Sequence, residues 1–128
     1  MTTVNGARIS GTSSSIPPVV GGTTDIRIIV LMPTSSFVGQ TFPVGSRPQS
    51  VAVADLNADG APDIVTANYF SHDVSVLLGN GNGAFHDQQR FAVGSRPFSV
   101  AVADLNADGA LDIVTADLSD DVSVLLQQ

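Results

Sequence analysis

Two short acidic loops contain the side chains of this chain that are best suited to bind an ion. Each loop is nine residues long, and the two share the pattern Asp-Leu-Asn-Ala-Asp-Gly-Ala-x-Asp, at residues 55–63 and 104–112. Oxygen-bearing side chains stand at loop positions 1, 3, 5 and 9, and glycine stands at position 6. Hard oxygen donors in this pattern suit a divalent cation, and Ca²⁺ fits best because it accepts carboxylate, amide and carbonyl oxygens together.

In the first loop, four side chains and one backbone carbonyl would hold the cation. A turn between two strands brings the two ends of a loop together, so these oxygens can converge on one point, with water completing the shell. They belong to the side chains of Asp55, Asn57, Asp59 and Asp63 and to the backbone of Ala61. We expect Gly60 at positive φ, where the chain turns sharply and only glycine fits at little cost. Without a cation, three carboxylates within nine residues would repel one another.

Acidic loops of this kind also occur in turns that bind no metal and in helical calcium-binding modules. Asp and Asn commonly accept hydrogen bonds from their own backbone, so the loops could simply cap hairpins. An EF-hand would need flanking helices and a Glu at position 12, whereas Thr66 and Thr115 stand there. A dockerin module has a similar loop but needs helices as well, and the flanking segments favour strands.

The segments that flank the loops are predicted to be β-strands, and we expect an all-β chain. All acidic residues are Asp and all basic residues are Arg, so the strong helix formers Glu and Lys are absent. Short strands are predicted at residues 51–55, 64–67 and 74–78, a turn at 79–83, and a fourth strand at about 85–93. Four short antiparallel strands joined by Gly, Asn and Asp turns describe one blade of a β-propeller.

An internal repeat sets the predicted domain organisation. Residues 42–66 recur 49 residues later as 91–115, and the offset falls to 48 after a one-residue deletion, so that Val74–Leu78 matches Val122–Leu126. We predict an incomplete ring of about two and a half blades. Its parts are a Ser/Thr/Gly/Pro-rich arm or linker at 1–22, a degenerate partial blade at 23–41, a full blade at 42–91, and a second blade lacking its last strand at 92–128.

Composition excludes several classes of function. The formal charge of −7 opposes nucleic acid, and two bound Ca²⁺ ions would reduce it to about −3. There is no cysteine for disulfides or thiolate metal sites, and no predicted membrane span or signal peptide. No pairing of nucleophile and base is recognisable, so we predict no catalytic residue and no enzyme activity.

These motifs resemble the FG-GAP or VCBS repeat, the blade unit of the integrin α-subunit propeller and of many bacterial extracellular proteins. The resemblance covers about residues 37–126, and it rests on Phe42–Pro48, its copy Phe91–Pro97, both acidic loops and Leu78–Phe85. It implies that each loop joins the first two strands of a blade and binds one Ca²⁺. The ligands that it implies in the second loop are Asp104, Asn106, Asp108, Ala110 and Asp112.

The resemblance also implies a non-enzymatic module for adhesion at the cell surface or outside the cell. Propellers of that family usually contain about seven blades, so this chain cannot close a ring alone. Unpaired strand edges then predict self-assembly into a homo-oligomer or assembly with further repeats, unless the chain is a fragment of a longer propeller. A protein or glycan ligand is conceivable. A lectin-like propeller is the alternative function, ranked lower because sugar sites need exposed aromatics and the chain has no Trp and one Tyr, Tyr69.

Overall fold

The computed structural model describes residues 3–4, 7–12 and 36–128. The chain divides into two compact units, residues 1–39 and 40–128. In the first unit, β1 (Thr3–Val4) pairs antiparallel with β2 (Ala7–Thr12). The predicted arm at 1–22 and the predicted partial blade at 23–41 lie for the most part outside the described residues.

A four-stranded antiparallel sheet, here called the first sheet, begins the second unit. Its strands follow one another in chain order, each paired with the next. They are β3 (Pro48–Ala54), β4 (Asp63–Asn68), β5 (Asp73–Leu77) and β6 (Gln89–Ala92). The three strands predicted from alternation and β-branched runs are therefore present. The fourth is shorter than expected because the chain first closes a loop, in which Gly79 bridges Phe85 and the Asn80 N–H donates to the Ala84 carbonyl at 3.1 Å.

A three-stranded antiparallel sheet, the second sheet, repeats the first three strands. It consists of β7 (Pro97–Ala103), β8 (Asp112–Asp117) and β9 (Asp121–Leu125). The pairing of Ala103 with Asp112 matches that of Ala54 with Asp63, so both acidic loops leave and re-enter their sheets at the same register. The one-residue deletion falls in the turn after the second strand, which spans residues 69–72 in one copy and 118–120 in the other.

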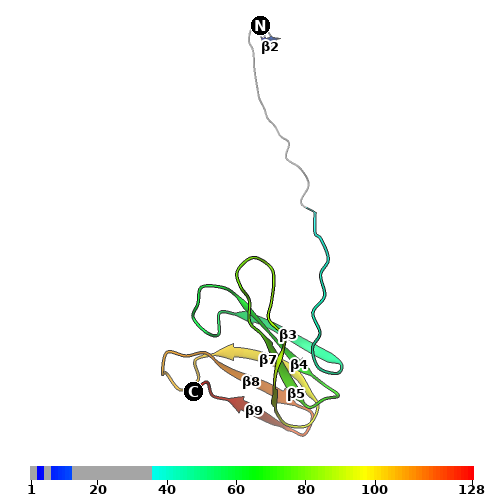
Figure 1. Ribbon diagram of the computed structural model, residues 1–128, viewed down its shortest axis with the longest axis vertical. Helices are drawn as coiled ribbons and strands as arrows, with labels where there is room; N and C mark the ends of the chain where they lie inside the picture. The colour runs from blue at the N-terminus through cyan, green and yellow to red at the C-terminus, as the bar shows by residue number, and fades with distance from the viewer. Residues whose placement is uncertain (1–2, 5–6, 13–35) are drawn as a thin grey trace. The chain divides into compact units, whose positions relative to one another are not determined.

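The core lies between the two sheets. The alternation of strand side chains directs Ala52 of β3 and the buried valines of β4 and β5 toward the second sheet, where β7 lies beside β3 and β4 (Figure 1). The buried apolar cluster consists of Leu56, Val65, Ala67, Val74, Val76, Val100 and Ile113. Full burial of one such side chain stabilises a fold by about 1.5–3 kcal/mol, so this cluster is the main force holding the sheets face to face.

The all-β prediction is confirmed for the part of the chain that the structure describes, which contains no helix. The two sheets of the second unit do not close into a ring. Accordingly, the described residues offer no helix long and apolar enough to cross a membrane.

Candidate metal centre

The first acidic loop connects β3 to β4 at one end of the first sheet. Because Ala54 pairs with Asp63, the first and last residues of the loop are held close together. Asp55 then closes the loop from inside: its carboxylate accepts the N–H of Asp59 at 3.2 Å and that of Gly60 at 2.8 Å. The carboxylate of Asp59 accepts the N–H of Ala61 at 2.9 Å. These bonds fix the turn of the loop backbone.

Asp63 anchors the loop to the sheet. Its carboxylate is fully buried and accepts two backbone hydrogen bonds, one from Leu56 and one from Gly79, each at 2.8 Å. A buried carboxylate is tolerated when its oxygens are hydrogen-bonded, and backbone donors provide that here. Gly79 belongs to the turn after β5, and nothing in the local sequence signalled that it would act as a donor to Asp63.

The backbone of each loop contains two residues in the left-handed region. Gly60 and Gly109 both lie at φ 88°, which confirms the prediction for Gly60. Ala58 and Ala107 lie at φ 57° and 60°, a conformation that costs an alanine about 1–2 kcal/mol. Sequence alone carries no signal for these alanines, because the residue type that usually marks a left-handed position is glycine or asparagine.

The second loop reproduces the first hydrogen bond by hydrogen bond. Asp104 accepts the N–H groups of Asp108 at 3.2 Å and Gly109 at 2.8 Å, and Asp108 accepts that of Ala110 at 2.9 Å. The buried Asp112 accepts the N–H of Leu105 at 2.8 Å. Its second backbone donor is Gln127 at 2.9 Å, which occupies the place of Gly79.

Three carboxylates of the second loop come close enough to share an ion. One oxygen from each of Asp104, Asp108 and Asp112 lies within 4.8 Å of the others, and two of the three residues are exposed. In the described part of the chain this is the one such group. The first loop has the same hydrogen bonds, but its Asp55, Asp59 and Asp63 do not form a group of this kind.

The remaining predicted ligands differ in their exposure to solvent. Asn57 and Asn106 are exposed at position 3, Ala61 is buried, and Ala110 is half-buried. The donors are all oxygen, without sulfur or imidazole, which suits a hard cation such as Ca²⁺ rather than zinc. In chemical terms the residues present therefore fit the predicted ion.

Backbone hydrogen bonds favour the ionised form of one carboxylate in each loop. The N–H of Ala61 is the main cause that lowers the pKa of Asp59, and the N–H of Gly109 is the main cause that lowers the pKa of Asp104. Within residues 36–128 the one ion pair joins Arg90 to Asp73 at 2.7 Å, so no cationic side chain there neutralises either loop. The negative charge of both loops is left uncompensated by that part of the chain.

Comparison with known proteins supports the relation that the motifs suggested. The family model of the FG-GAP-like repeat matches residues 55–115, a stretch that begins at the first acidic loop and runs through the second. This segment is similar to the FG-GAP-like repeat. No match was found among curated proteins or among solved structures.

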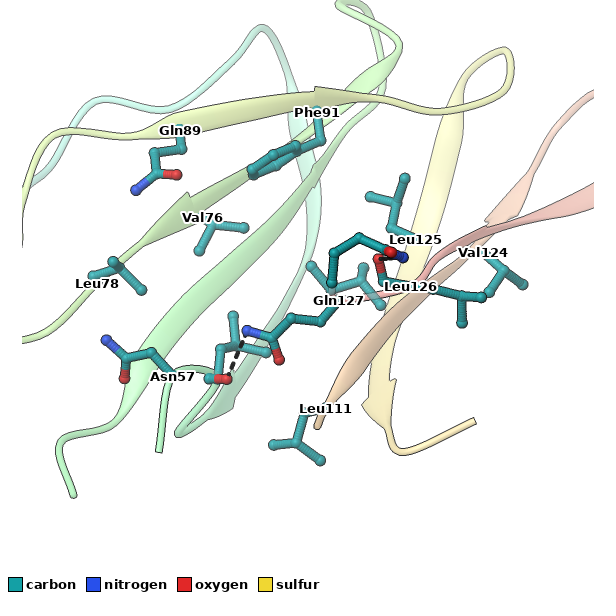
Figure 2. A pocket seen from close by; sticks show the side chains of 13 residues that line it. Asn57, Val76, Leu78, Gln89, Phe91, Leu111, Val124, Leu125, Leu126 and Gln127 are labelled. Atoms are coloured by element: carbon teal, nitrogen blue, oxygen red, sulfur yellow. Dashed lines mark hydrogen bonds between the residues drawn. The ribbon is translucent and has the colours of Figure 1, made fainter. Parts of the chain in front are cut away.

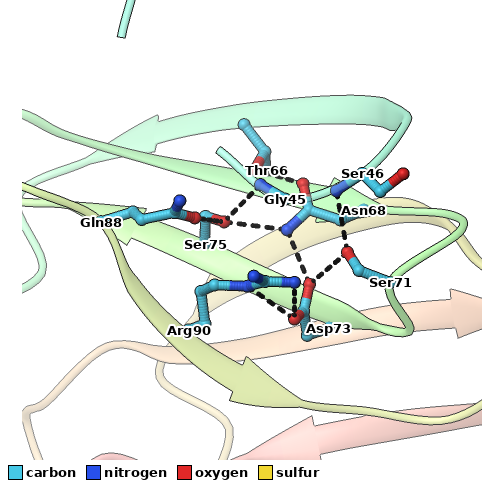
Figure 3. A network of polar contacts seen from close by, with 9 residues as sticks. All are labelled: Gly45, Ser46, Thr66, Asn68, Ser71, Asp73, Ser75, Gln88 and Arg90. Atoms are coloured by element: carbon cyan, nitrogen blue, oxygen red, sulfur yellow. Dashed lines mark hydrogen bonds and ion pairs between the residues drawn. The ribbon is translucent and has the colours of Figure 1, made fainter. Parts of the chain in front are cut away.

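A buried polar network stiffens the first sheet (Figure 3). The side-chain amide of Asn68 donates to Asp73 and to Ser75, each at 2.8 Å, and Arg90 of β6 donates to Asp73 through Nε at 2.8 Å. The N–H of Gly45 donates to the Ser75 hydroxyl at 3.1 Å, which fixes the segment before β3 against the sheet. We assign this network a structural role, since its polar groups form hydrogen bonds with one another.

An apolar cleft of about 660 Å³ opens between the two sheets of the repeat, beside the first loop (Figure 2). Asn57, Leu78 and Phe91 line one side, and the C-terminal residues line the other. The side chain of Gln127 crosses the cleft, and its Nε2 donates to the Leu56 carbonyl at 3.1 Å. The second sheet is thereby connected to the first acidic loop.

Proposed function

We propose that this chain is a non-enzymatic, Ca²⁺-binding, propeller-type repeat module that serves adhesion or assembly outside the cell. Each acidic loop takes one Ca²⁺. The observation that carries the proposal is the proximity of the Asp104, Asp108 and Asp112 oxygens, within 4.8 Å of one another on a loop with no cationic neighbour in residues 36–128.

Repulsion between ionised carboxylates is what a cation would relieve. The backbone donors of the loop hold each carboxylate in place, but a carboxylate oxygen has a second lone pair that remains free for a metal. We place the ligands of the first ion on Asp55, Asn57, Asp59, Ala61 and Asp63, by the same hydrogen-bond pattern. Those of the second ion are Asp104, Asn106, Asp108, Ala110 and Asp112.

The propeller interpretation extends the same reasoning to the sheets. The first sheet has the four antiparallel strands of a blade, and its loop lies between the first two strands, as the FG-GAP-like family implies. We propose that residues 42–91 are one blade, 92–128 a second, and 23–41 part of another. Rigid Ca²⁺-bound corners would hold each blade in a shape that packs against its neighbour.

Assembly and location follow from the family and the strand edges. Among the described residues β9 pairs with β8 alone, which leaves its other edge open to a further strand. An open edge of this kind favours pairing with another chain. We therefore propose a homo-oligomer or an assembly with further repeats, at the cell surface or in the extracellular space.

Thermal melting with and without Ca²⁺ tests the metal proposal. For a dissociation constant of about 0.1–1 mM, about 2 mM Ca²⁺ would stabilise the fold by about 0.6–1.8 kcal/mol per site. In a unit of this size that corresponds to a rise of several degrees in melting temperature relative to EDTA. Mg²⁺ at the same concentration should have a smaller effect, because it demands a tighter octahedral shell. Equal melting temperatures in Ca²⁺ and in EDTA would reject Ca²⁺ binding.

A further inference from the structure

Each of the two sheets carries valines on both faces, and residues 36–128 cover the valines of only one face of each. We call the face of the first sheet that packs on the second sheet its front face, and the opposite one its back face. The strands of the second sheet pair in the same register as those of the first, so equivalent residues define its front and back faces. The core is thus the front face of the first sheet packed on the back face of the second.

The front face of the second sheet is uncovered in residues 36–128, although its residues are the same as those of the covered one. Val74 and Val76 on β5 are 0% and 6% exposed, whereas their counterparts Val122 and Val124 on β9 are 64% and 49% exposed. The strands that carry them have the same sequence, Asp-Val-Ser-Val-Leu. The surface that forms the core in one copy therefore faces solvent in the other.

The back face of the first sheet shows the reverse relationship. Val51 of β3 is 62% exposed, and its counterpart Val100 of β7 is 8% exposed because it packs under the first sheet. Val53 is 64% exposed, and its counterpart Val102 is partly buried against the core. Both strands read Val-Ala-Val-Ala at these positions.

The segment preceding each sheet is also equivalent. The N–H of Gly45 donates to Ser75 at 3.1 Å, and the N–H of Gly94 donates to Ser123 at 2.8 Å. The segment before each sheet is therefore held in the same way at the two back faces. A surface that packs on the back face of the second sheet should also fit the back face of the first.

We propose that a second copy of this chain docks the back face of its first sheet onto the front face of the second sheet, reproducing between chains the sheet packing seen within one chain. Val51 and Val53 of one copy then lie against β7 and β8 of the other, as β7 lies against β3 and β4 within one chain. Val122 and Val124 of β9 belong to the face that this docking covers. The contact is head-to-tail, so a dimer still has one free face of each kind, one on each copy, and further copies can add. Edge pairing of strands is not required, and neither is metal binding.

Mixing two complementary variants tests this docking. Val51→Asp/Val53→Asp blocks the back face of the first sheet, and Val122→Asp/Val124→Asp blocks the front face of the second. We measure the mass of the full chain by sedimentation over a range of about a hundredfold in concentration, always with Ca²⁺ present. Wild-type chains should associate as concentration rises. Each variant alone should stay monomeric, and an equimolar mixture should form a dimer, since each variant retains the face that the other lacks.

Several outcomes would overturn the proposal. They are a wild-type chain that stays monomeric throughout, a variant that associates as the wild type does, and a mixture that forms no dimer. The control Val38→Asp, at an exposed valine outside both sheets, should associate normally. If an Asp variant melts early, Thr at the same positions keeps valine's shape and should weaken association by about tenfold or more. Ca²⁺ binding is tested separately, by the melting temperature in Ca²⁺ and in EDTA. The docking proposal and the metal proposal can therefore fail independently.

Discussion

The carboxylate of Asp63 accepts a hydrogen bond from the backbone N–H of Gly79, 16 residues away, at 2.8 Å. Its other oxygen accepts the N–H of Leu56. One buried side chain thus connects the acidic loop, β4 and the turn that follows β5. Asp63 therefore has a structural role that is separate from any role as a metal ligand.

Asp63→Asn should destabilise the fold even when no metal is present. An amide has one oxygen and cannot accept both backbone bonds, so one buried N–H loses its partner, at a cost of about 1–3 kcal/mol. Urea unfolding in EDTA measures this loss. Asp59→Asn is the matched control: the residue is exposed and Asn keeps the one oxygen that Ala61 needs, so its effect should stay within about 0.5 kcal/mol. Equal losses for both variants would contradict the anchoring role.

Gly79→Ala should also destabilise the fold, because a Cβ at this position would overlap the carbonyl oxygen of Pro62. Backbone must move to relieve that overlap, and such overpacking typically costs about 1–3 kcal/mol. The control is Gly39→Ala, where a Cβ would meet nothing within 4 Å. Denaturant midpoints that fall equally for both variants would argue against close packing at Gly79.

Ala58→Gly should stabilise the fold, or at least not weaken it. The φ of 57° strains an alanine, and glycine removes that strain although it makes the unfolded chain more flexible. We expect a gain of up to about 1 kcal/mol, and the same for Ala107→Gly. The opposite change, Gly60→Ala at φ 88°, should lower stability by about 1 kcal/mol. A clear loss of unfolding free energy in Ala58→Gly would refute the strain at this position.

The metal-free fold should lose stability in acid. The folded loops hold the pKa values of Asp59 and Asp104 below the ordinary value of 3.8, through the N–H groups of Ala61 and Gly109 respectively. A carboxyl with a lowered folded pKa stabilises the fold above its unfolded pKa, and this stability is lost as pH falls through the folded value.

Melting temperature in EDTA should therefore be steady above about pH 5 and fall below about pH 4. The double variant Asp59→Asn/Asp104→Asn should have a shallower fall, while Asp87→Asn, at an exposed position outside both loops, should follow the wild type. An unaltered acid slope in the double variant would show that other groups control it.

Local sequence signals predicted most of the sheets and the outline of each loop. Alternation and β-branched runs located β3, β4 and β5, and the requirement for a tight turn located the positive φ of Gly60. Interactions between distant residues carried no such signal. The bonds from Gly79 and Gln127 to the buried aspartates depend on how strands meet in space, and Gln127 even differs in type from its counterpart.

The faces of the sheets show the same limit of sequence. Val74 and Val122 stand in identical local sequences, yet one is fully buried and the other mostly exposed. No pattern within either strand distinguishes them, because burial depends on which sheet lies opposite. The repeat indicated that the units are equivalent, and only the structure showed that their surroundings differ.

Calorimetric titration of the metal-free chain with Ca²⁺ measures directly whether the two acidic loops bind this ion. We expect saturable binding of one ion at each of the two acidic loops. Asp104→Asn/Asp108→Asn should abolish one site and leave the other, and Asp55→Asn/Asp59→Asn should do the converse. Absence of saturable binding to the folded wild-type chain, or binding that both double variants retain in full, would contradict the assignment of Ca²⁺ to these loops.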